Sequence, residues 1–325
     1  MNQIPAQKDR SEPVPPRNLL AILAAGFEQT TNHLWLVVLP LLLDVFFWIG
    51  PRLGMQEIIE RNLALFAGQP GFETVHQMMA EVAPRTNLFN SLSLPLIGVP
   101  TLMAGPTPEK TPILPLVVEL NSVWAWMLLF VLFTALGTLL SGLYLTLIAT
   151  SLQEQRVEAS QFIRKFLTST INLVLLIISV LITLFILAMI MLPIWLVISL
   201  LSQGAAALVG FLALVLALWL IIYMSFSVHD IYLNASPFWL AIWKSTRLVQ
   251  QFLWPTMALF GGIYLINLMF AWLWQLAESG SWLTIFSIVG HGFISTSLIV
   301  ATFIYFTDRV RLVKWAAPSM RNQSA

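Results

Sequence analysis

The stretch at 166–228 limits most strongly what this chain can fold into, because it contains no Asp, Glu, Lys, Arg or His. Only the Ser-Gln-Gly segment at 202–204 interrupts it near the middle. The hydrocarbon core of a bilayer is about 30 Å thick and requires about 20 apolar residues per helix. The stretch therefore predicts two membrane-spanning helices, at 170–200 and 205–226, joined by a tight turn.

The composition of the whole chain agrees with a membrane class. The 325 residues are 58% hydrophobic and 10% charged, whereas soluble domains have a charged fraction of about 25%. The net charge of +1 gives no reason to expect nucleic acid as a partner. Cysteine is absent, which excludes disulfides, thiolate nucleophiles and cysteine-based metal sites.

The other apolar runs extend this pattern to an all-α, polytopic integral membrane protein with six transmembrane helices arranged as three hairpins. We expect one membrane domain at 18–315, between a disordered cytoplasmic tail at 1–17 and a C-terminal tail at 316–325. The six predicted spans are 33–49, 122–149, 170–200, 205–226, 252–276 and 282–306.

The first two spans are separated by a long insert at 52–121. It begins with two amphipathic stretches, at 54–68 and 72–83. It continues as an apolar run at 87–117 that contains six prolines and so excludes a regular helix. We expect this run to form an extended cap over the outer ends of the helices; the alternative is a re-entrant loop.

Three amphipathic segments, at 19–30, 157–166 and 237–250, each lead into a span that runs from inside to outside. We expect them to be helices lying in the cytoplasmic interface. The first and third copies share Leu-Ala-Ile at 20–22 and 240–242, and then His-Leu-Trp at 33–35 against Phe-Leu-Trp at 252–254. A threefold repeat is one interpretation; the other is that any polytopic chain needs interfacial helices before its spans.

The distribution of basic residues predicts the orientation. With the N-terminus inside, only Arg52, Arg61, Arg85 and Lys110 of the 16 basic residues lie outside, all of them in the long insert. Cytoplasmic loops carry the excess of Lys and Arg. The sequence thus predicts a multi-pass protein of the cell (plasma) membrane with both termini in the cytoplasm.

Two ionisable residues are predicted to lie near the bilayer midplane. Asp44 is about 16 Å past the start of the first span, and His291 is about 14 Å into the sixth. An aspartate at that depth costs roughly 2.5–3.5 kcal/mol on insertion scales. One hypothesis is that Asp44 and His291 pair and line a proton or substrate path. The alternative is a structural role, either as a buried pair or with a protonated Asp44 hydrogen-bonded between helices.

Other polar residues suggest contacts at the membrane surface or between helices. His229, at the cytoplasmic mouth beside Lys244 and Arg247, could form a lipid headgroup patch with them; the alternative is a solvated interface. Asn172, Asn267 and Gln275 are predicted to make hydrogen bonds between helices.

The segment at 235–249, Ala-Ser-Pro-Phe-Trp-Leu-Ala-Ile-Trp-Lys-Ser-Thr-Arg-Leu-Val, resembles the amphipathic segment of certain bacterial six-helix membrane proteins. These include the membrane domain attached to some glycerophosphoryl diester phosphodiesterases. The resemblance covers about 60 residues and implies a six-helix membrane fold. The opening segment at 34–51 also looks like bacterial membrane proteins of this kind. The catalytic barrel of the phosphodiesterases, with its acidic metal ligands, has no counterpart, so their activity is not implied.

The sequence lacks the HExxH, GxSxG and Walker motifs, and we expect no enzyme activity and no cofactor or metal. The expected partners are the lipid bilayer and another membrane protein. The function that fits these features is a non-enzymatic scaffold or accessory subunit. The alternative is a transporter or permease-like protein that uses Asp44 and His291 at the midplane.

Overall fold

The structure is a computed structural model that describes residues 17–65, 72–93, 98–105, 108, 110–153, 158–274, 276–278 and 280–321, without the side chains of Val75 and 314–321. The predicted N-terminal tail lies outside this part of the chain except for Arg17. The predicted C-terminal tail begins inside a helix, because the last helix continues to Arg321.

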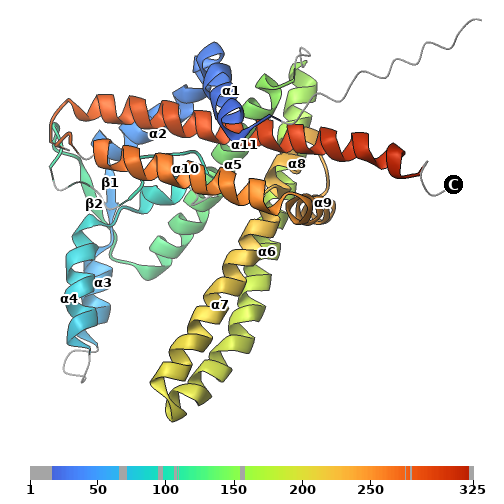
Figure 1. The fold of residues 1–325 in the computed structure, drawn as a ribbon. Helices are drawn as coiled ribbons and strands as arrows, with labels where there is room; N and C mark the ends of the chain where they lie inside the picture. Colours follow the sequence, from blue (N-terminus) through green and yellow to red (C-terminus); the bar gives the residue numbers. More distant parts are fainter. Residues whose placement is uncertain are drawn as a thin grey trace, which may run out of the picture.

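The fold is helical, with one short pair of parallel strands, β1 (Arg52–Gly54) and β2 (Val117–Glu119), which joins the two ends of the insert. The other elements, in chain order, are α1 (Leu19–Asn32), η1 (Leu34–Val37), α2 (Val38–Ile49), α3 (Gln56–Ala64), α4 (Glu73–Val82), η2 (Ala83–Arg85), η3 (Leu88–Leu92), α5 (Val123–Ser151), α6 (Ala159–Leu201), α7 (Gln203–Met224), α8 (Ser227–Asn234), α9 (Phe238–Gln251), α10 (Leu253–Trp274) and α11 (Thr284–Arg321) (Figure 1).

Several of these helices are suited to a membrane. Five in the described chain are long and apolar enough to cross a bilayer, or up to six if the bent pair at 19–32 and 34–49 counts as one span. The five lie within α5, α6, α7 with α8, α10 and α11. These helices fit a multi-pass membrane protein.

Two of the three predicted hairpins are present as neighbouring helices: α6 packs on α7, and α10 packs on α11. Helix α2, which lies in the first predicted span, packs on α11, and the rings of Trp48 and Trp282 lie 5.7 Å apart. The first predicted hairpin, α2 with α5, is interrupted by the insert. The ring of Phe89 lies between them, 5.2 Å from Phe46 of α2 and 4.9 Å from Phe133 of α5.

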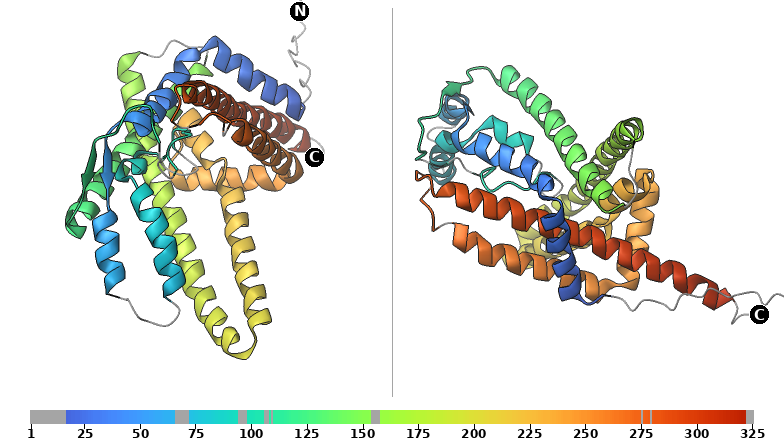
Figure 2. Two further views of the ribbon diagram at one scale, coloured as in Figure 1. Left: turned by 90° about the vertical axis from the view of Figure 1, so that its left-hand side faces the viewer. Right: turned by 90° about the horizontal axis from the view of Figure 1, so that it is seen from above.

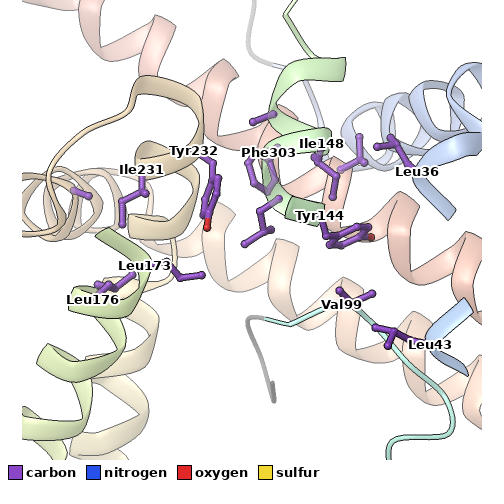
Figure 3. Close-up of a cluster of buried hydrophobic side chains, with 14 of the residues drawn as sticks. Leu36, Leu43, Val99, Tyr144, Ile148, Leu173, Leu176, Ile231, Tyr232 and Phe303 are labelled. Carbon is purple, nitrogen blue, oxygen red and sulfur yellow. The ribbon is translucent and has the colours of Figure 1, made fainter. Parts of the chain in front are cut away.

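The proline-rich part of the insert packs between the helices that flank it. Val99 is buried in the same apolar cluster as Leu43 and Tyr144 (Figure 3). Leu92 lies so close to α5 that a methyl group on Gly137 would be 2.5 Å from its carbonyl oxygen. These contacts attach the segment to α2 and α5, while the cap over the outer helix ends and the re-entrant loop both stay predictions.

Two joints between helices have similar geometry. At His33 the chain bends by 92° between α1 and the η1–α2 segment, and at Phe252 it breaks between α9 and α10. The two residues have φ/ψ of −133°/55° and −122°/38°. Pro255 lacks an N–H for the carbonyl of Gln251, which removes one helical hydrogen bond at this break. These joints support the likeness between the first and third amphipathic segments.

The second amphipathic segment differs from the other two. The predicted helix at 157–166 is not a separate element, because α6 runs without a break from Ala159 to Leu201. No proline or glycine lies in the first half of α6, so nothing in the sequence ends the helix there. The structure thus has two bent copies and one straight one.

The best-packed part of the molecule is a group of short helices, α1, α8 and α9, which we call the platform. It surrounds α11 beyond Ser297 and the adjoining ends of α5 and α6. By contrast, the α6–α7 hairpin projects away from the body at a steep angle to α10 and α11 (Figures 1 and 2). The last buried residue of α6 is Leu176, and α7 buries only Ala206.

Candidate functional site

Asp44 lies fully buried on α2, five residues before the helix ends. Its Oδ1 accepts a hydrogen bond of 2.7 Å from the backbone N–H of Met103, in the proline-rich part of the insert. Its Oδ2 has no hydrogen-bond partner in the part of the chain that the structure describes. Asp44 thus holds the middle of the proline-rich segment against α2, a role that its position in the sequence did not reveal.

His291 does not complete a pair with Asp44. Its Nε2 lies 3.4 Å from the hydroxyl of Ser295, one turn along its own helix. The helices that carry the two residues are nevertheless adjacent: a methyl group on Gly292 would lie 3.4–3.7 Å from Val37 of η1 and from Leu41 and Pro40 of α2. The structure brings the two helices together but forms no hydrogen bond between the two side chains.

A second group of polar residues lies at the platform, around Asp230 of α8. Its carboxylate is 2% exposed and receives Nζ of Lys244 at 2.9 Å. The side-chain amide of Asn234 donates to its other oxygen at 2.6 Å, and Lys244 also donates to the hydroxyl of Ser236 at 2.9 Å. A buried carboxylate is stable only with such partners.

The turn between α8 and α9 brings these residues together. Ala235, which ends α8, has a left-handed backbone conformation with φ of 50°. Pro237 then starts α9, where the N–H of Phe238 donates to Oδ1 of Asn172 at 3.0 Å. This bond from α6 to α9 confirms Asn172 as an interhelical partner. Asn267 bonds within its own helix instead, to the carbonyl of Ile263; Gln275 lies outside the described residues.

A cavity of about 460 Å³ opens beside this group, between α8, α9 and α11. One side is polar, and the opposite side is apolar. The polar lining residues are Asp230, Asn234, Ser236, Lys244, Arg247 and Gln251, and the apolar ones are Leu248, Phe306, Val310 and Val313. The structure therefore brings together Lys244 and Arg247, two of the three predicted headgroup contacts.

The third predicted headgroup residue, His229, lies elsewhere. It is 7% exposed and does not line the cavity. Its Nε2 is 2.7 Å from the hydroxyl of Thr302, and its ring is 4.4 Å from that of Phe303. His229 is thus a packed core residue between α8 and α11. Its place next to Asp230 in the sequence misled the prediction, since adjacent residues on a helix point in different directions.

Arg309 is a buried charge that the sequence pattern did not single out. Its guanidinium is 9% exposed and lies over the rings of Tyr305, at 4.8 Å, and Phe252, at 5.5 Å. Asp308 is its ion-pair partner at 3.4 Å. The spacing of Tyr305 and Arg309, one helical turn apart, is the signal that could have indicated this stacking.

Within the described chain, no three His, Asp or Glu side chains gather so that they could hold a metal ion. Compared with known proteins, the chain matches no family model, no curated protein and no solved structure.

Proposed function

We propose that the protein is a non-enzymatic scaffold or accessory subunit of a membrane assembly, which uses the α6–α7 hairpin to contact another membrane protein. The observation that carries this proposal is the isolation of the hairpin beyond Leu176. Phe185 and Ile190 of α6 and Phe211 of α7 are all more than half exposed. Transmembrane helices are stabilised by close packing with neighbouring helices, and beyond Leu176 the described chain gives α6 and α7 little packing except against each other.

The proposal includes the topology that the sequence predicts: six spans, both termini in the cytoplasm, and a location in the plasma membrane. It requires the α6–α7 hairpin, which lies at a steep angle to α10 and α11 in this structure (Figures 1 and 2), to align with them in the bilayer. Its support is that Lys244 and Arg247 lie on the platform, Arg17 directly precedes α1 and Arg309 lies on α11, and basic residues favour the cytoplasmic side. It also includes a relation to the six-helix membrane domains of glycerophosphoryl diester phosphodiesterases, supported by the segment at 235–249 alone.

Site-specific photo-crosslinking in the native membrane tests the proposal. We expect a benzophenone amino acid at Phe185 or Phe211 to give a discrete cross-linked protein of constant mass, because a partner helix lies within reach. The matched control is Met269 of α10, which is 72% exposed and equally apolar. Lipid adducts alone at all three positions would contradict a protein partner on the hairpin.

The second candidate is a transporter or permease-like protein, and Asp44 favours it. A buried carboxylate oxygen without a partner, beside irregular backbone from the insert, is the kind of site found in proton and ion pathways. Asn at this position keeps an acceptor for the Met103 N–H but cannot carry a proton, so Asp44→Asn separates the two roles of the carboxylate.

We expect a transporter of this kind to dissipate an imposed pH gradient in proteoliposomes, and Asp44→Asn to abolish the flux. Equal flux in the two proteins would remove Asp44 from the mechanism. His291→Gln serves as the second variant, because His291 makes no bond to Asp44. If the pH gradient persists in the proteoliposomes of the wild type and in those of the variant, proton leak and uniport are excluded and the accessory role is favoured.

A further inference from the structure

The cavity between α8, α9 and α11 has a chemistry that neither the accessory nor the transport function uses. Its polar side presents hydrogen-bond donors, and its apolar side is continuous with α11. We propose that it binds the phosphate of an anionic glycerophosphate group, held as the headgroup of a phospholipid. The site is separate from the α6–α7 hairpin, on which the proposed function rests.

The charge that faces the cavity is positive in spite of Asp230. That carboxylate is 2% exposed and already receives Lys244 and Asn234, so it acts as an anchor for Lys244. An ammonium group has three N–H donors. Those on Lys244 go to both oxygens of Asp230, at 2.9 and 3.3 Å, and to the hydroxyl of Ser236, so this side chain, which is 42% exposed, contributes positive charge to the cavity rather than a free donor.

Arg247 supplies the second cation, and its side chain is preorganised by a neighbouring ring. Its guanidinium lies 4.6 Å above the ring of Trp243, one turn earlier on α9. This stacking restricts the orientation of the guanidinium plane. No carboxylate in the described chain is paired with it. A planar guanidinium forms two parallel hydrogen bonds to phosphate oxygens. Gln251, one further turn along, adds an amide donor.

The source of the phosphate follows from the surroundings of the cavity. Trp239 and Trp243 of α9 and Trp254 of α10 are 63%, 56% and 81% exposed. Exposed tryptophans are enriched at the level of lipid headgroups. The wall formed by Phe306, Val310 and Val313 suits a glycerol backbone and the start of an acyl chain better than a fully hydrated ion.

Native mass spectrometry of the full chain in mild detergent, titrated with defined lipids, tests the site. We expect phosphatidylglycerol to bind at least about fivefold more tightly than phosphatidylcholine, which is the effect of roughly one basic side chain at a lipid surface. Arg247→Gln should abolish this preference, and Arg247→Lys should restore part of it. Arg164→Gln, which removes an exposed charge on α6 outside the cavity, is the matched control.

Competition with glycerol 3-phosphate distinguishes the two sources of the ligand. If phosphatidylglycerol stays bound in excess glycerol 3-phosphate, the ligand of the site is a lipid. If instead the protein shows no preference among lipids but binds glycerol 3-phosphate, and Arg247→Gln abolishes that binding, the same phosphate site takes a soluble ligand. The proposal would be overturned if the wild type and a folded Arg247→Gln variant bound phosphatidylglycerol equally and the substitution also left the binding of glycerol 3-phosphate unchanged.

Discussion

Gly26→Ala is expected to lower the free energy of unfolding by about 2 kcal/mol, and Gly26→Leu to prevent accumulation of the folded protein. A methyl group at Gly26 would lie 2.5 Å from the carbonyl oxygen of Ser297 and 2.7 Å from Cβ of Ala301. Both contacts are on α11, where α1 crosses it (Figure 1). Backbone cannot move aside locally, so α1 would have to separate from α11 and expose the cluster around Ile22.

The measurement is unfolding in bicelles titrated with SDS, followed by the fluorescence of the 13 tryptophans. Gly261→Ala on α10 is the matched control, because a methyl group there meets open space. Alanine is intrinsically favoured over glycine in a helix by about 1 kcal/mol, so we expect the control to leave stability unchanged or to raise it. Equal stability of the two variants would contradict the close crossing of α1 and α11.

Lys244→Leu is expected to destabilise the fold by about 2 kcal/mol, because it leaves the carboxylate of Asp230 buried with only the amide of Asn234. Removing one partner of a fully buried pair costs about 3–5 kcal/mol, and the partial exposure of Lys244 reduces that figure. The same unfolding titration measures the effect. The double variant Asp230→Asn with Lys244→Leu should recover part of the loss, since no charge is then left buried.

Arg247→Leu provides the comparison for Lys244→Leu, since it removes an equal charge three residues away on the same helix. Arg247 is exposed, and its contact with Trp243 is worth about 0.5–1 kcal/mol. We therefore expect a loss of less than 1 kcal/mol. If Lys244→Leu is no more damaging than Arg247→Leu, or if the double variant recovers nothing, Asp230 does not depend on Lys244.

Much of the helical pattern could be predicted from the sequence alone. The uncharged run at 166–228 predicts the α6–α7 hairpin, since only helices satisfy the backbone of so long an apolar stretch in lipid. The breaks before α2 and α10 were expected from the amphipathic segments at 19–30 and 237–250, each of which was predicted to end before a span. Asn172 was correctly assigned as an interhelical partner. These predictions succeed because hydrophobicity, periodicity and proline act locally along the chain.

Only the tertiary structure decided where distant segments meet. Nothing near Asp44 in the sequence indicates that Met103 would donate to it, and a proline-rich segment has no period from which its depth could be inferred. The importance of Gly26 depends on a helix that begins more than 250 residues later. His229 and Lys244 appear equally placed in the sequence, yet one is buried in the core and the other lines the cavity. Packing between distant helices determines these positions, and that information lies in the fit of surfaces rather than in any local pattern.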